Sequence, residues 1–273
     1  MKNIIIFIIA LIIPVCGSAT EQIPDILIWK GDTSYIFAVP LERHSDINSL
    51  RSKLFGEKET DTHIVCGRGY MAEWSIIEDE IYLTNIFSCQ YYQDSIKSDL
   101  KTLFGDKCKN GRVKADWITG DFTVPKGKIL QRILFGSHFY EFEVVLTFKE
   151  GALIVYKECD NTKTRTSKFI QNQDSLNKFI YSNVDWNKVP DLKDKTIRVL
   201  ITIHSGATSK ADTIFVARAS DNEFLTQEAL RVAKLIPEWD VYYKLGEVHK
   251  QIYTLPINFN EKNRAKYSPN RTK

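Results

Sequence analysis

The chain has 273 residues, of which 43% are hydrophobic, 26% are charged and 12% are aromatic, and its formal charge is +3. This balance excludes wholesale disorder and a polytopic membrane protein, and 13 Gly and 8 Pro exclude a collagen-like or low-complexity chain. The length allows one large domain or two medium ones. Composition alone therefore indicates a globular protein and identifies no activity.

The first 19 residues have the order of a secretory signal peptide. Lys2 supplies the charged start, an unbroken apolar run covers residues 4–13, and Gly17 and Ala19 are the small residues before a cut after Ala19. The apolar run is shorter than the roughly 20 residues that a membrane-spanning helix needs. We expect an exported protein, free in the periplasm. A lipid anchor at Cys16 is the less favoured alternative, because the residue before it is not small.

The basic residues concentrate at the C-terminal end. Residues 261–273 hold five basic residues and one Glu, hence +4, while loss of Lys2 with residues 1–19 leaves +2 on the mature chain. The stretch 20–260 therefore carries −2, which argues against a nucleic-acid partner. We expect residues 261–273 to form a disordered basic tail.

Short apolar segments separated by turn signals dominate residues 20–158. Their alternating pattern is typical of a β-rich domain built as a meander or a sandwich. Two short helices are expected within it, over Ser45–Phe55 with Ser45 as the N-cap and over Ser95–Phe104. The expected strands cover 26–29, 35–39, 71–77, 81–87, 113–117 and 141–148.

Four cysteines follow the signal peptide, and an exported protein meets an oxidising compartment in which disulfides form. Four cysteines allow three pairings. Cys89 and Cys108 flank one expected helix and are the favoured pair. Cys66 and Cys159 are then expected to be buried thiols.

A polar segment marks the boundary between two domains. Residues 160–175 hold few apolar side chains, and a short helix over Leu176–Tyr181 follows. We therefore expect a linker over residues 159–189, with a second domain over residues 190–260.

The second domain has a β-β-α-β pattern. Two strands, at 197–203 and 213–219, precede an amphipathic helix from Asn222 to Leu235, with Ser220 and Glu223 at capping-box spacing. A long final strand covers Val248–Phe259. The whole chain is thus expected to have an α+β fold, with a helix covering one face of a small antiparallel sheet in this domain.

Several short strings in the last third occur together in a fixed order. They are Glu228-Ala229-Leu230-Arg231, then Ile236-Pro237-Glu238-Trp239, then Gly246 with Val248, and finally YTLPINF at 253–259. This ordered set resembles the C-terminal domain of the TonB family. One departure is Asp240-Val241-Tyr242, where relatives usually carry Pro and Gly. In the first domain, RGYMAEW at 68–74 and ADWITG at 115–120 are similar to strings of exported bacterial proteins of unknown role.

The resemblance implies a periplasmic domain that captures a short segment of an outer-membrane transporter, the TonB box, by adding it as a strand to an exposed sheet edge. The final strand is the expected edge, because Pro256 lacks an N–H and is tolerated only where that side of a strand is unpaired. The expected contact residues are Val248, Lys250, Gln251, Ile252, Tyr253, Thr254 and Leu255.

A complete energy transducer also needs a membrane helix that stays attached and a long Pro-rich spacer, and the sequence offers neither. We therefore expect a TonB-type domain used as a binding module linked to outer-membrane transport. Pairing of the final strand with its own copy, in a homodimer, is the alternative.

Motifs of catalysis are sparse. The sequence has no nucleophile elbow, phosphate loop or dinucleotide motif, and His63-x-x-Cys66 has no second pair of metal ligands. Glu73 and Asp116 each precede a Trp and are candidates for the carboxylate pair of a glycoside hydrolase. We expect a non-enzymatic protein without cofactor or metal, and a carbohydrate-active enzyme is the minor alternative.

Overall fold

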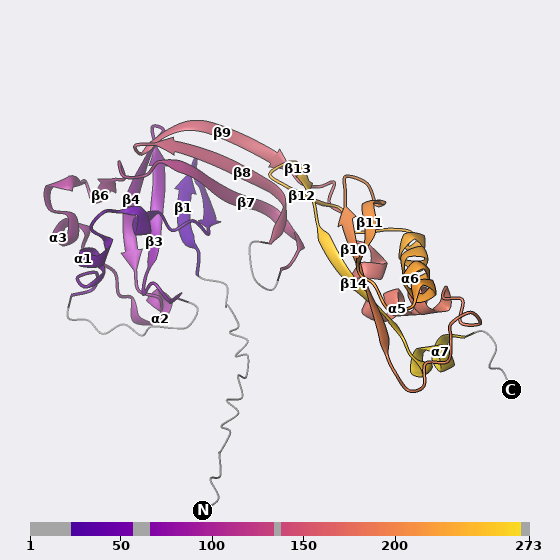
Figure 1. The fold of residues 1–273 in the computed structure, drawn as a ribbon. Coiled ribbons are helices and arrows are strands. Elements are labelled where there is room, and N and C mark those ends of the chain that lie inside the picture. Colours follow the sequence, from indigo (N-terminus) through magenta and orange to yellow (C-terminus); the bar gives the residue numbers. More distant parts are fainter. Residues whose placement is uncertain (1–22, 57–65, 134–137, 269–273) are drawn as a thin grey trace, which may run out of the picture.

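A computed structural model describes residues 23–56, 66–133 and 138–268 of the chain. The fold is α+β and has two hydrophobic cores, one in each half of the chain (Figure 1). The expected signal peptide, with Cys16, lies outside the described residues. Within those three ranges, no helix is long and apolar enough to cross a membrane.

Nine strands of the first half share one sheet, instead of two packed sheets. The order is β2-β1-β3-β4-β9-β8-β7, β6 pairs with β4 and β5 pairs with β6; β1 and β3 are parallel, whereas the other pairs are antiparallel. Alternation buries one side of strands such as β3 and β4, which place Trp74 and Leu83 in the first core. The strands are β1 (Asp25–Trp29), β2 (Asp32–Ile36), β3 (Met71–Ile77), β4 (Glu80–Phe87), β5 (Cys108–Lys109), β6 (Arg112–Lys114), β7 (Gly120–Gln131), β8 (Phe139–Lys149) and β9 (Ala152–Asp160).

The helices of the first half are shorter than expected. The N-cap of α1 is Asp46 and not Ser45, and no side-chain capping bond forms there. The helix expected from Ser95 begins only at Leu100, where the Asp99 carboxylate accepts from the backbone N–H of Lys101 at 2.9 Å. The helices are η1 (Pro40–Arg43), α1 (Ile47–Arg51), α2 (Tyr91–Asp94), α3 (Leu100–Phe104) and η3 (Gly105–Lys107).

A tight hairpin replaces the strand expected over residues 113–117. Asn110 and Gly111 both have positive φ, 51° and 73°, which suits the two central residues of a hairpin turn. Cys108 consequently pairs with Val113 across β5 and β6. The strand β6 ends at Lys114, so Trp117 lies in the turn that follows.

The second half contains a three-stranded antiparallel sheet in the order β11-β10-β14, and α6 packs on β10 and β11. Buried residues of alternating strand positions, such as Val199 and Ile257, form the second core with Ala229 of the helix. The N-cap of α6 is Asn222, whose side chain accepts from the backbone N–H of Leu225 at 3.1 Å. The elements are β10 (Ile197–Ser205), β11 (Ala211–Arg218), α6 (Glu223–Leu235) and β14 (Ile252–Phe259).

Segments expected to be linker and tail also belong to the second half. Helix α5 contributes Leu176 and Ile180 to the second core, and α7 places Tyr267 against it. Residues Glu261–Tyr267 are therefore helical and packed, contrary to the disordered tail expected from 261, and residues 269–273 lie outside the description. These helices are α4 (Lys168–Gln171), α5 (Gln173–Ser182) and α7 (Glu261–Tyr267).

A hairpin joins the two halves. Strands β12 (Tyr242–Lys244) and β13 (Glu247–His249) lie at the far end of the long strands β8 and β9 (Figure 1). Its tip needs positive φ at Leu245 and Gly246, +55° and +78°.

Buried side chains of β8 and of the segment after β9 hold this tip. Glu143 Oε2 accepts from the N–H of Leu245 at 2.7 Å, and Asn161 Oδ1 accepts from the N–H of Gly246 at 2.9 Å. The Asn161 amide also donates to Glu143 at 2.9 Å and to the carbonyl of Tyr140 at 3.0 Å. Because Glu143 and Asn161 are almost completely buried, each hydrogen bond here compensates a desolvated polar group.

Candidate functional site

The outer edge of β14 is the candidate site. β14 pairs with β10 along one side, from Ile252 opposite His204 to Phe259 opposite Ile197. No strand pairs with its other side within the described residues. An unpaired strand edge presents a row of backbone donors and acceptors to solvent.

The register determines which backbone groups point outward. The N–H of Ser205 donates to the carbonyl of Gln251 at 2.9 Å, so Gln251 directs its backbone groups toward β10. In an antiparallel ladder the direction alternates from residue to residue. Tyr253, Leu255, Ile257 and Phe259 therefore bond to β10, whereas Ile252, Thr254, Pro256 and Asn258 direct their backbone groups to the outer edge.

Two contacts close the C-terminal end of this edge. The backbone N–H of Asn258 donates to the hydroxyl of Tyr181 at 3.1 Å, and the carbonyl of Asn258 accepts from the side-chain amide of Asn263 at 2.9 Å. Both partners lie away from β10, which agrees with the alternation. Pro256 has no N–H to offer. The open stretch therefore has two donors, at Ile252 and Thr254, and three acceptors, at Ile252, Thr254 and Pro256.

The two faces of the sheet beside this edge differ. One face is packed against α6 and buries Leu255 and Ile257. On the other face Ile252 is 69% exposed and Phe215 of β11 is 45% exposed, and Thr254 and Pro256 are exposed too. An added strand would thus continue a sheet with one packed and one open face.

Only some of the contact residues expected from the sequence lie on the open edge of β14. Val248 lies in β13 opposite Tyr243, Lys250 lies between the strands, and Gln251 bonds to β10, so these three are not part of the open edge. The expected single strand from Val248 to Phe259 is thus two strands.

Of the other expected contact residues, Ile252 and Thr254 direct backbone groups outward, whereas Tyr253 and Leu255 face β10 and the core. The Tyr253 hydroxyl donates to Asp240 Oδ2 at 3.3 Å, and burial together with the nearby Asp240 carboxylate raises the pKa of that phenol. Tyr181 and Asn263 were not expected at this site, because they come from the segments expected to be linker and tail.

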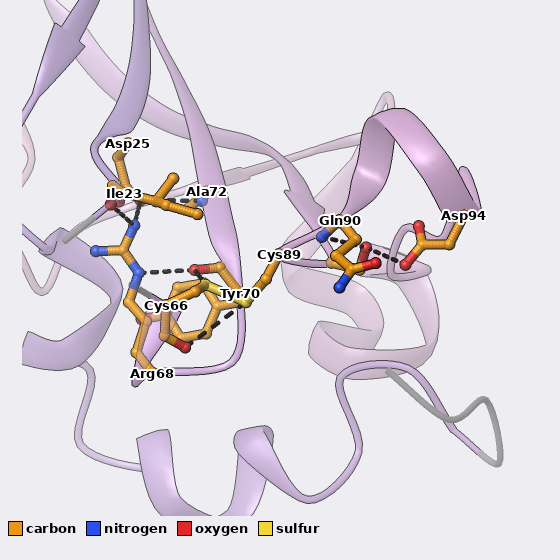
Figure 2. The surroundings of a disulfide bond; sticks show 10 residues. Ile23, Asp25, Cys66, Arg68, Tyr70, Ala72, Cys89, Gln90 and Asp94 are labelled. Atoms are coloured by element: carbon orange, nitrogen blue, oxygen red, sulfur yellow. Dashed lines mark hydrogen bonds and ion pairs between the residues drawn. A yellow bond between two sulfur atoms is a disulfide. The ribbon is translucent and has the colours of Figure 1, made fainter. Parts of the chain in front are cut away.

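The first domain contains a disulfide between Cys66 and Cys89 (Figure 2). The expected pair, Cys89 with Cys108, is therefore wrong, and so is a free thiol at Cys66. Cys108 is a half-buried thiol, held in β5 by the unexpected hairpin at Asn110, and Cys159 is a buried thiol, as expected. The disulfide links the segment before β3 to the segment after β4. These two strands pair along their length.

A buried ion pair lies beside this disulfide (Figure 2). The Asp25 carboxylate is completely buried and accepts from Arg68, from the backbone N–H of Ala72 at 3.0 Å and from Trp74 Nε1 at 2.9 Å. Burial raises the pKa of Asp25 to about 6, although Arg68 acts in the opposite direction. Arg68 also donates to the carbonyls of Tyr70 and Ile23, so it ties the start of β1 to the turn before β3.

The two carboxylates proposed for glycoside hydrolysis lie apart. Glu73 on β3 is opposite Asn85 of β4 and accepts from its side chain at 2.7 Å, whereas Asp116 follows β6, whose Lys114 is opposite Tyr82. The rows of Glu73 and Lys114 are three residues apart along β4 and two strand spacings apart across it, about 10 Å in each direction, and Asp116 lies two residues beyond Lys114. A hydrolase pair is about 5–9.5 Å apart, so the structure does not bring Glu73 and Asp116 together.

Metal ligands do not cluster in the described part of the chain. No group of three His, Cys, Asp or Glu side chains there is arranged to hold a metal ion. Cys66 is engaged in the disulfide, and His63 lies outside the described residues.

Comparisons with family models, with curated proteins and with solved structures find no match to this chain.

Proposed function

We propose that this chain is an exported, non-enzymatic binding protein whose C-terminal domain captures an extended peptide by strand addition along β14. The observation that supports this most is the pair of outward N–H groups at Ile252 and Thr254, with three carbonyls beside them and no strand on that side in the described chain. The β-β-α-β order and the resemblance to the TonB C-terminal domain favour a TonB-box-like segment of an outer-membrane transporter as the partner.

The edge sets the length of the peptide. The open stretch from Ile252 to Pro256 is about 17 Å long at about 3.4 Å per residue. A captured strand of about five residues would satisfy it, and Tyr181 blocks continuation toward Asn258. Backbone hydrogen bonds would supply affinity, and alternate peptide side chains would contact the open face near Phe215.

A peptide titration tests this proposal. The chain without residues 1–19 is labelled with ¹⁵N and titrated with a TonB-box-like peptide, and backbone amide shifts are followed. We expect the largest shifts at Ile252 and Thr254. Absence of shifts along β14 at millimolar peptide would rule the proposal out.

A matched pair of variants identifies the edge. Thr254→Pro removes an outward N–H but no bond to β10, so we expect it to fold and to lose binding. Thr254→Val keeps the N–H and the branched shape, and it should bind as the wild type does. Equal affinity of the two variants would contradict strand addition at this edge.

The same edge supports a second candidate, a homodimer. In an antiparallel pair centred on Thr254, the N–H of Ile252 in each copy would donate to the carbonyl of Pro256 in the other. Sedimentation equilibrium distinguishes peptide capture from dimer formation. A chain that is monomeric at high concentration and still binds peptide would exclude the homodimer.

A further inference from the structure

The first domain has a cavity of about 490 Å³ between the β1–β2 hairpin and the strands β7, β8 and β9. This volume lies in the range of small-molecule sites, about 300–1,000 Å³. The cavity lies in the first domain, whereas the β14 edge belongs to the second. Binding of a ligand in the cavity therefore does not depend on peptide capture at β14.

Apolar side chains line the cavity from both sides. Leu27, Val124 and Val144 are at most 7% exposed and form its inner surface. Phe142 and Tyr156, each 44% exposed, extend this apolar surface toward solvent. Apolar surface that lines a concave site is typical of a site for an apolar ligand.

The mouth of the cavity has a cation, Lys30, that forms no salt bridge with another described residue. The Lys30 ammonium lies 4.4 Å from the centre of the Trp29 ring and 5.2 Å from that of Tyr156. No carboxylate lies within salt-bridge distance of Lys30 among the described residues. Lys126, on the opposite wall, is 3.9 Å from Asp32, whose side chain is 79% exposed.

The other carboxylates of the lining have donors of their own. Glu158 accepts from the hydroxyl of Tyr156, Asp160 from the N–H and hydroxyl of Thr162, and Glu143 from the hairpin tip. These donors are neutral, so the carboxylates keep their charge, and Lys126 shares its charge with Asp32. Lys30 is therefore the cation of the lining that a ligand's head group can pair with.

We propose that this cavity binds a single-chain amphiphile with an anionic head, such as a fatty acid. The alkyl chain lies against Leu27, Val124 and Val144, and the side chains of Phe142 and Tyr156 cover the alkyl chain. The head group meets the ammonium group of Lys30 at the mouth. A cationic head would be repelled by Lys30, and a neutral head would not form an ion pair with it.

Calorimetric titration with dodecanoate, below the concentration at which it forms micelles, tests this proposal. The chain without residues 1–19 should bind dodecanoate at one site and bind dodecyltrimethylammonium more weakly. Absence of binding would overturn the proposal. Equal or tighter binding of the cationic amphiphile would overturn the assignment of the head group.

Two matched pairs of variants locate the site. Phe142→Ala removes a half-exposed wall and should weaken dodecanoate binding about tenfold, because apolar area is no longer covered. Phe215→Ala changes an equally exposed Phe in the other domain and should bind as the wild type does. Lys30→Glu should weaken binding several-fold, whereas Lys149→Glu, outside the cavity lining, should not.

Because all four positions lie at the surface or in a turn, circular dichroism is expected to show folded variants. Wild-type affinity in Phe142→Ala, or equal losses in Phe142→Ala and Phe215→Ala, would overturn the location of the site.

Discussion

The hydroxyl of Tyr181 accepts a hydrogen bond from the backbone N–H of Asn258 at 3.1 Å, on the side of β14 away from β10. Helix α5 thus occupies the C-terminal end of an edge that is otherwise open. This contact limits where a further strand can pair, and its side of the strand agrees with the alternation that the pairing of β14 with β10 sets.

Tyr181→Phe should remove this bond and leave the ring in the second core. We expect faster hydrogen exchange at the Asn258 amide and a loss of about 1 kcal/mol in the free energy of unfolding, the usual contribution of one such bond. Urea denaturation and NMR exchange measure the two effects. Tyr267→Phe, on the neighbouring ring of α7, is the control, and its Asn258 amide should exchange as in the wild type. An unchanged Asn258 exchange rate in Tyr181→Phe would contradict the assignment.

Removal of the disulfide should destabilise the first domain. Cys66 and Cys89 are 23 positions apart, and closing a loop of that length stabilises the folded chain by about 3 kcal/mol in the chain-entropy model. Cys89→Ser should therefore lower the melting temperature, and a reducing agent should lower that of the wild type but not that of the variant. Cys108→Ser is the control. If it lowered the melting temperature as much as Cys89→Ser, the pairing of Cys66 with Cys89 would be wrong.

Asp25→Asn should destabilise the fold, because its amide NH2 would face one of the buried donors, Ala72 N–H or Trp74 Nε1–H, that now donate to the two carboxylate oxygens. A buried donor left without an acceptor costs about 1–3 kcal/mol. Urea denaturation at pH 7 measures the loss. Asp32→Asn, at an exposed position, should change stability little.

The pH dependence of stability tests the direction of the Asp25 shift. The pKa of this carboxyl is raised from 3.8 to about 6, so the folded chain binds more protons than the unfolded chain between these values. Its contribution to the free energy of unfolding is therefore present at pH 4 and is lost as the pH rises past 6. The difference in stability between wild type and Asp25→Asn should shrink over this range. A difference that grows with pH would mean that Arg68 lowers the pKa below 3.8.

The interdomain junction should be sensitive to Asn161. Asn161→Ala removes three hydrogen bonds, to Gly246, Tyr140 and Glu143, in a buried place. We expect a loss of about 2 kcal/mol or more in the free energy of unfolding, measured by urea denaturation. Thr162→Ala, at the next, exposed position, should lose little. Equal effects of the two variants would mean that the hairpin tip is not held by Asn161.

Local sequence patterns predicted the strands β10 and β11 and the helix α6 well. The alternating apolar residues of β10 and the stripe that runs through Leu225, Ala229 and Val232 on α6 each match a face that is buried. Pro256 also indicated correctly that one side of the last strand is unpaired with any strand of the described chain. In each case the signal is a periodicity or a missing N–H, which depends on neighbouring residues alone.

Features that depend on distant residues were missed. The disulfide pairs two strand ends, and the register of β3 with β4 that sets them side by side is not visible in the spacing of cysteines. Helix α5 is only moderately apolar, and its role depends on Tyr181 reaching Asn258, which is 77 positions away. The hairpin at Asn110-Gly111 is different, because that dipeptide is a strong turn signal and was available in the sequence.

In the proposed function, β14 offers the backbone groups of alternate residues to a partner. Hydrogen exchange of its amides, measured by NMR on the chain without residues 1–19, tests this most directly. We predict fast exchange at Ile252 and Thr254 and slow exchange at Tyr253, Leu255 and Ile257, with Ile252 and Thr254 alone becoming slow when peptide is added. Uniformly slow exchange in the free protein, or protection of the other residues on peptide addition, would contradict the open edge on which the proposed function rests.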